Sequence, residues 1–171
     1  MKNILFFFIL LPLINLSQDK RGYIVNIGEK APEFVINKKN FLEENKGKVI
    51  MLQFTASWCS VCIKEMPYIE NEIWKIHKEN RDFILLGLAK DTKQHPQRDE
   101  EIHQMIDKTK VTYPIYRDEN SEIFNLFAEK KAGVTRNIII DKKGNIAFLT
   151  RLFEKKEFNE MKKEIEKLLN N

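Results

Sequence analysis

Two cysteines, Cys59 and Cys62, are the residues of this 171-residue chain whose type and spacing point most directly to chemistry. They follow an apolar run over residues 49–54 and open a stretch of helical periodicity. Cysteines three residues apart in a first helical turn can reach each other, and the first lies where unpaired N–H groups and the helix dipole favour a thiolate. The lowered pKa makes Cys59 the nucleophile, while a buried Cys62 stays protonated until it resolves a mixed disulfide. The pair therefore predicts thiol–disulfide exchange.

Two other interpretations of the pair are less favoured. A structural disulfide would close a loop of about four residues, which stabilises a fold by only about 2 kcal/mol on the chain-entropy model. Half a metal site would need further ligands, and none of the three histidines, His77, His95 and His103, has zinc-like spacing to the cysteines. An exported binding domain that holds copper or a closed disulfide is the corresponding non-enzymatic alternative.

The surrounding elements alternate between strands and helices. Apolar runs over 49–54 and 83–89 predict two strands that are covered on both faces. A helix is predicted between them from about Cys59, with apolar side chains at helical spacing at Ile69, Ile73, Trp74 and Ile76. The polar stretch 91–100 is predicted as a loop, followed by a short amphipathic helix that carries Ile102, Met105 and Ile106.

The last third of the chain predicts another helix, a hairpin and a terminal helix. Ser121 is the expected N-cap of a helix with Ile123, Phe124 and Phe127 facing inward. Residues 137–140 and 146–149 are the expected hairpin strands. An amphipathic helix ends the chain, with an apolar stripe of Phe158, Met161, Ile165, Leu168 and Leu169. This order predicts an α/β fold whose central mixed β-sheet is flanked by helices, with parallel strands from the crossovers and an antiparallel pair at one edge.

Residues 1–17 have the pattern of a secretory signal rather than of a folded element. A short basic start precedes an apolar stretch over residues 4–14, and a polar sequence follows, with cleavage expected after Ser17. Eleven helical residues span about 16 Å, against a hydrocarbon core of roughly 30 Å. An uncleaved anchor is the alternative. The chain is therefore expected to be periplasmic or otherwise exported, where cysteines can form disulfides.

The remaining residues, 18–171, are long enough for a single domain, and the composition of the chain excludes some classes of protein. Hydrophobic residues make up 43% of the chain, so it can build a core, and the two cysteines exclude a disulfide-rich scaffold. The net charge of +4 arises from 29 basic and 25 acidic residues mixed along the sequence. Such mixing indicates a solvated surface, and no nucleic-acid partner is expected.

The segment Phe54-Thr55-Ala56-Ser57-Trp58-Cys59-Ser60-Val61-Cys62 resembles the active-site segment of the thioredoxin superfamily. Three flanking motifs, at 28–34, 64–67 and 140–144, are similar to those of exported thiol–disulfide oxidoreductases of the TlpA/ResA kind, and the likeness covers roughly residues 26–169. The resemblance implies a thioredoxin-like fold and a redox-active Cys59–Cys62 disulfide, with no cofactor or metal. Its implied partners are exported proteins that carry disulfides and a membrane protein that donates electrons through thiols.

The chain departs from thioredoxin at the position six residues before Cys59. Thioredoxin has a buried aspartate there, whereas this chain has Gln53, which cannot take a proton. Glu65, three residues after Cys62 and on the same helical face, is the expected replacement as the catalytic base. The TlpA/ResA kind has a functional glutamate at the matching position. The alternative is a solvent-exposed glutamate on a helix.

A second departure falls where the superfamily places a cis-proline opposite the cysteines. Here that position is Thr135, for which a trans peptide bond is expected because a non-proline cis bond costs about 3 kcal/mol. Its backbone is expected to pair with the substrate. Arg136 is expected to place a cation near the thiolate or to bind a substrate carboxylate. A surface arginine after a turn is the alternative for this residue.

Trp58 is expected to form an apolar ledge beside the nucleophile, with core packing as the alternative. The predicted function is a protein disulfide oxidoreductase, most consistent with the reduction of disulfides in exported proteins. A peroxiredoxin-like thiol peroxidase is the alternative enzyme. Its proline–threonine–cysteine pattern is missing here, since Thr55 lies four residues before Cys59 and no proline precedes it.

Overall fold

The computed structural model describes residues 21–171, so the predicted signal over residues 1–17 lies outside the described part. The strands are β1 (Val35–Ile36), β2 (Lys39–Asn40), β3 (Val49–Thr55), β4 (Phe83–Lys90), β5 (Ile115–Asp118), β6 (Arg136–Ile140) and β7 (Ile146–Leu149). The α-helices are α1 (Phe41–Glu44), α2 (Ser60–Ile69), α3 (Lys75–His77), α4 (Asp99–Thr109), α5 (Phe124–Phe127) and α6 (Lys155–Asn170). A π-helical turn, η1 (Glu70–Trp74), joins α2 to α3, and a 3-10 turn, η2 (Glu119–Ser121), precedes α5.

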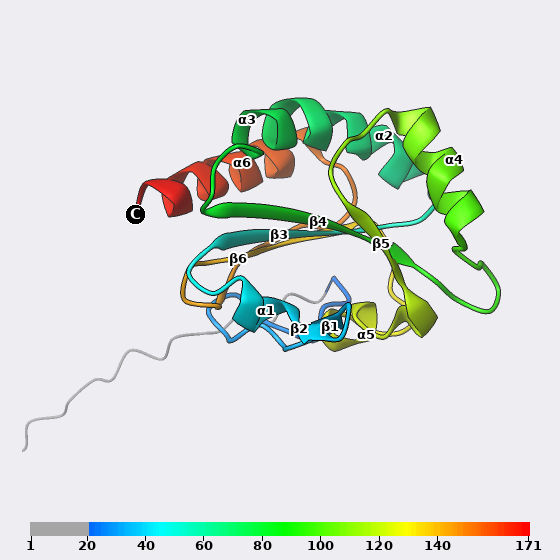
Figure 1. The fold of residues 1–171 in the computed structure, drawn as a ribbon, viewed down its shortest axis with the longest axis horizontal. Helices are drawn as coiled ribbons and strands as arrows, with labels where there is room; N and C mark the ends of the chain where they lie inside the picture. Colours follow the sequence, from blue (N-terminus) through cyan, green and yellow to red (C-terminus); the bar gives the residue numbers. More distant parts are fainter. Residues whose placement is uncertain (1–20) are drawn as a thin grey trace, which may run out of the picture.

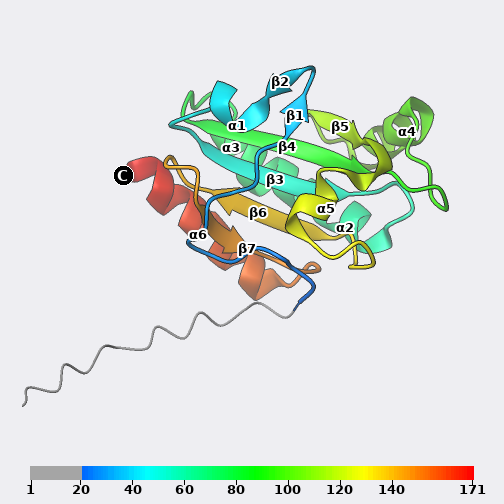
Figure 2. The ribbon, with the colours of Figure 1, turned by 90° about the horizontal axis from the view of Figure 1, so that it is seen from below.

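Five strands form one mixed sheet in the order β5-β4-β3-β6-β7. The β3–β4 and β4–β5 pairs are parallel, whereas β3–β6 and β6–β7 are antiparallel. Helices α2, α3, α4 and α6 cover one face of the sheet, and α1, α5 and the β1–β2 hairpin lie on the other (Figure 1). The view from below shows the same sheet with α5 and the hairpin in front (Figure 2). The predicted α/β fold with a mixed sheet is confirmed.

Each face of the sheet has its own apolar core, because side chains alternate along β3 and β6. Phe54 and Ile138 belong to the core under α5 and the N-terminal segment. Met51 and Ile139 belong to the core under α2, α4 and α6. Cys59 and Cys62 lie in the first of these cores, at the end of β3.

The structure corrects several predictions outside the site. Ser121 is not a helix N-cap, since its hydroxyl donates to Asp91 O at 2.7 Å. The carboxylate of Asp118 accepts the free N–H groups of Ile123 and Phe124 instead, both at 2.8 Å. Helix α4 begins at Asp99, inside the segment 91–100 that was predicted as a loop. Ile76, named among the apolar side chains of the helix after Cys59, is 64% exposed. Strand β5 and the β1–β2 hairpin were not predicted.

Among residues 21–171, no helix is both long and apolar enough to cross a membrane.

Candidate active site

The cysteine pair lies at the junction of β3 and α2 and is closed into a disulfide, with 5.3 Å between the two Cα atoms. Cys59 is the N-cap of α2, and its Sγ accepts the N–H of Cys62 at 3.2 Å. An N-cap side chain normally accepts such an N–H through oxygen, so sulfur takes that place here. Cys59 keeps 8% of its surface exposed and Cys62 keeps none. Cys59 is therefore the more accessible of the two cysteines.

Thr135 faces the disulfide from the segment that enters β6. Its Oγ1 lies 3.2 Å from Cys59 Sγ and 3.2 Å from Cys62 Sγ. Residues 21–171 contain no cis peptide bond, so the expected trans geometry at Thr135 is confirmed. The residue is 4% exposed. Its hydroxyl therefore occupies the space beside both sulfurs.

Glu65 lies in α2 and is 1% exposed, so the alternative of a solvent-exposed glutamate is wrong. Its Oε1 accepts a hydrogen bond from Asn137 Nδ2 at 2.8 Å. Burial raises the pKa of Glu65 from 4.5 to about 8, and the amides of Asn137 and Gln53 oppose that larger effect. A carboxyl group with this pKa can both accept and release a proton near neutral pH.

Strand pairing brings the two amides to Glu65. Gln53 on β3 is the antiparallel partner of Asn137 on β6, so both side chains leave the same face of the sheet, beneath α2. Tyr113 donates its hydroxyl to Gln53 Oε1 at 2.7 Å, and Asn137 Nδ2 also donates to Thr150 Oγ1 at 3.0 Å. Glu65 Oε2 and Gln53 Nε2 are buried without a hydrogen-bond partner in the described part of the chain. The polar cluster is thus incompletely paired at the carboxyl group itself.

Trp58 is 47% exposed, so it is a surface residue next to Cys59 in sequence rather than part of the core. Its ring packs against that of exposed His95, with 4.8 Å between the ring centres. His95 belongs to the loop between β4 and α4, which thereby borders the cysteine site. Together the two rings form an aromatic surface next to Cys59.

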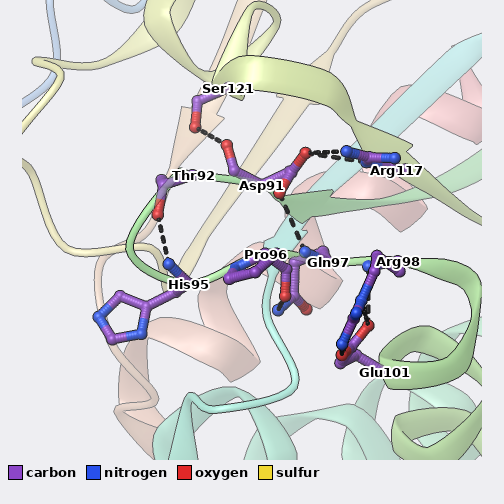
Figure 3. A network of polar contacts seen from close by, with 9 residues as sticks. All are labelled: Asp91, Thr92, His95, Pro96, Gln97, Arg98, Glu101, Arg117 and Ser121. Atoms are coloured by element: carbon purple, nitrogen blue, oxygen red, sulfur yellow. Dashed lines mark hydrogen bonds and ion pairs between the residues drawn. The ribbon is translucent and has the colours of Figure 1, made fainter.

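Gln97 ties the same loop to the segment just before the cysteines. The side chain is fully buried; its Oε1 accepts the N–H of Ser57 at 2.8 Å, and its Nε2 donates to Ser57 Oγ at 3.0 Å and to Pro96 O at 2.8 Å. Asp91 holds the other end of the loop by accepting the N–H of Gln97 and pairing with Arg117 (Figure 3). The loop position next to Trp58 is therefore fixed by buried hydrogen bonds.

Replacing Gln97 by Ala is expected to lower the free energy of unfolding by about 2 to 3 kcal/mol, since buried backbone and side-chain groups lose their partners. Urea unfolding followed by circular dichroism measures the loss. Gln104→Ala, on the exposed side of α4, is the matched control and should change stability by less than about 0.5 kcal/mol. Equal stabilities for the two variants would show that the hydrogen bonds of Gln97 do not stabilise the fold.

Arg136 is 1% exposed, so the alternative of a surface arginine is wrong. Its Nε donates to Gly133 O at 2.9 Å and its Nη2 to Arg21 O at 2.7 Å, while the guanidinium carbon lies 4.4 Å from the centre of the Tyr23 ring. Within residues 21–171, the contacts of the Arg136 side chain do not include the sulfur of Cys59 or of Cys62. The side chain anchors the segment before β6, and the expected role of Arg136 in substrate binding stays a prediction.

Within the described residues, no group of three or more histidine, cysteine, aspartate or glutamate side chains could hold a metal ion.

The model of the Redoxin family matches residues 26–169. The chain belongs to the Redoxin family. This Redoxin chain is 30% identical over 126 residues to the thiol–disulfide oxidoreductase ResA of Bacillus thuringiensis subsp. konkukian, which covers 71% of this chain and 68% of the relative. It is 27% identical to ResA of Geobacillus thermodenitrificans over 71% and 67% of the two chains.

Solved structures agree with the sequence relatives. The Redoxin chain is similar to a candidate protein disulfide isomerase from Bacteroides thetaiotaomicron, with a TM-score of 0.80, 45% identity and coverage of 88% of this chain and 94% of the other. A DsbE-type chain from Chlorobium tepidum has a TM-score of 0.69 at 20% identity, covers 85% of this chain and 99% of its own, and supports the fold alone. This Redoxin protein is a dithiol disulfide oxidoreductase of the TlpA/ResA-like branch of the thioredoxin superfamily.

Sequence reasoning missed three residues of the site, namely Asn137, Gln97 and Tyr113. A signal for Asn137 was present, because an amide directly before a buried apolar run is expected to have a buried partner. Gln97 gave no such signal, since it lies in a polar stretch that is typical of exposed loops. Tyr113 lies in the segment before β5, which was not predicted as a strand.

Proposed function

We propose that this oxidoreductase reduces disulfides in exported proteins, with Cys59 as the nucleophile and Cys62 as the resolving thiol. The observation that carries the proposal is the unequal exposure of the two cysteines at the β3–α2 junction. A disulfide between one partly exposed cysteine and one fully buried cysteine suits exchange with a partner protein. A structural disulfide has no need of the polar cluster around Glu65.

The reaction starts from the reduced enzyme. The thiolate of Cys59 attacks one sulfur of the substrate disulfide, the substrate S–S bond breaks, and the departing substrate thiolate takes a proton. Cys62 then loses its proton and attacks the Cys59 sulfur of the mixed disulfide. The Cys59–Cys62 bond forms, the second substrate thiolate leaves, and two electrons have passed from enzyme to substrate.

Glu65 is the proposed acceptor of the Cys62 proton. An ordinary thiol has a pKa of about 8.5, and transfer between groups of similar pKa is efficient. The pKa of about 8 for Glu65 meets that condition. In the reverse half-reaction, when a donor reduces the enzyme, protonated Glu65 returns the proton to the departing Cys62 thiolate.

The partner is proposed to dock on the surface around Cys59. Trp58 offers an exposed aromatic face there, and Thr135, whose Oγ1 lies 3.2 Å from Cys59 Sγ, is proposed to pair with the partner through its backbone. Residues 1–17 are proposed to direct export, either as a cleaved signal or as an anchor. In an oxidising compartment, the enzyme then needs a membrane protein that supplies electrons through its own thiols.

Reduction of insulin by the purified domain, recharged with dithiothreitol, tests the proposed activity. We expect catalysed precipitation of the insulin chains above the rate with dithiothreitol alone, and no catalysed consumption of hydrogen peroxide. Peroxide consumption without insulin reduction would favour the peroxidase, and inactivity in both assays would favour a binding domain. A reduction potential close to the roughly −120 mV of a strong oxidant would reverse the proposed direction.

A further inference from the structure

The hydroxyl group of Thr135 has no role in the activity described so far. Its contacts within residues 21–171 are with the two sulfurs, each at 3.2 Å, and the residue is 4% exposed. A buried hydroxyl retains one proton to donate, and leaving it without an acceptor is unfavourable. The sulfur atoms are therefore the acceptors to which this proton can be directed.

Hydrogen bonds fix the backbone that carries the hydroxyl. Thr135 O accepts the N–H of Leu152 at 3.1 Å, which holds the backbone of Thr135 itself. Preceding residues are held by two buried cations, since Arg136 Nε donates to Gly133 O at 2.9 Å and Lys90 Nζ donates to Ala132 O at 3.3 Å. A β-branched side chain also has few χ1 rotamers. The donor is thus oriented before any reaction begins.

We propose that Thr135 is a catalytic residue that donates a hydrogen bond to the thiolate of Cys59. This inference rests on the proposed function and adds a residue to its mechanism. When the disulfide opens, negative charge collects on Cys59 Sγ, which already accepts the N–H of Cys62 at 3.2 Å. The hydroxyl of Thr135 supplies a second donor, and hydrogen bonds to charged acceptors are stronger than neutral ones. Thr135 keeps its proton throughout.

The same hydrogen bond affects both the rate and the potential. At a pH below the pKa of Cys59, stabilising the thiolate increases the fraction of Cys59 that can attack a disulfide. It also favours the reduced form, which raises the reduction potential of the pair. Proline, which the thioredoxin superfamily usually has at this position, carries no hydroxyl and provides neither effect.

Thr135→Val removes the hydroxyl at nearly constant volume, and Thr135→Ser retains it. In a Cys62→Ser background, which leaves Cys59 as the one thiol, iodoacetamide at pH 6 measures the thiolate fraction. We expect Thr135→Val to react about tenfold more slowly than its parent and Thr135→Ser to stay within about twofold. In the dithiol chain, Thr135→Val should lower the reduction potential by about 30 mV, the equivalent of tenfold in the equilibrium constant.

Thr109→Val is the control, because Thr109 is also buried but its hydroxyl donates to Met105 O inside α4, at 2.8 Å. It should leave both measurements unchanged. If Thr135→Val does not fold, Thr135→Ala removes the same hydroxyl without filling its space. Unchanged alkylation and potential in the variant that lacks the hydroxyl, or an equal loss in Thr135→Ser, would overturn the inference. Insulin reduction by the unsubstituted chain tests the proposed function separately.

Discussion

Cys59→Ser is expected to lose catalysed disulfide reduction, by on the order of a thousandfold or more, because serine offers no thiolate to attack the substrate. Cys62→Ser is expected to retain the first step and lose the second. The mixed disulfide on Cys59 then persists, since the buried residue that would attack it has no sulfur. The two variants remove one sulfur each from the same helical turn, yet they predict opposite behaviour towards a partner protein.

Trapping on the two variants measures this difference. A disulfide-bearing substrate incubated with reduced Cys62→Ser should form a covalent adduct on non-reducing gels that dithiothreitol releases. Cys59→Ser is the matched control, since it retains one thiol of the pair and should form almost no adduct. Adducts of equal yield on both variants, or on Cys59→Ser alone, would contradict the assignment of Cys59 as the nucleophile.

The two central strands were predictable because burial on both faces leaves a strong local pattern. Every residue of β3 is buried, and nearly every residue of β4. Strand β5 lies at the edge of the sheet, and three of its four residues are half-buried or exposed, as is typical of a loop. Its pairing with β4 comes from the tertiary fold, which a local pattern does not contain. The prediction of the residue that caps α5 was wrong for a similar reason, because the hydrogen bonds come from Asp118, the last residue of β5.

Within the site, spacing predicts the residues near Cys59, the family resemblance supplies Thr135, which lies beside both sulfurs, and the other distant residues were not predicted. Cys59, Cys62 and Glu65 lie within two helical turns, so spacing alone relates them. Asn137 reaches Glu65 only because the register of β3 and β6 places it opposite Gln53. Gln97 meets Ser57 across 40 residues of sequence, through the path of a loop. The spacing to Cys62 points to Glu65, whereas burial in the fold raises its pKa and strand register supplies the two amides that oppose this rise.

Glu65→Gln is expected to change how stability depends on pH. The folded pKa of about 8 lies above the ordinary value of 4.5, so the folded chain binds a proton that the unfolded chain releases between these values. Its stabilising effect is fully present below pH 4.5 and is lost as the pH rises through 8. The loss in the unsubstituted chain amounts to about 3 to 5 kcal/mol. Glutamine cannot ionise, so the variant should lack this part of the pH dependence.

The same substitution is expected to slow the second step of exchange. Without a proton acceptor, Cys62 must lose its proton to water, and loss of a general base typically costs about a hundredfold or more. The pH profile is the decisive feature, since a structural role for Glu65 would not remove a titration from it. Stopped-flow measurement of mixed-disulfide resolution between pH 5 and pH 9 separates this step from the initial attack by Cys59.

The difference in unfolding free energy between Glu65→Gln and the unsubstituted chain isolates this carboxyl group, because all other titrating groups contribute equally to both. It should be small near pH 4.5 and grow in favour of the variant up to about pH 8. Glu79→Gln, whose side chain is 90% exposed, is the control and should show a difference that does not vary with pH. A constant difference for Glu65→Gln would mean that the folded chain leaves this carboxyl group with its ordinary pKa, and Cys62 would then need another base.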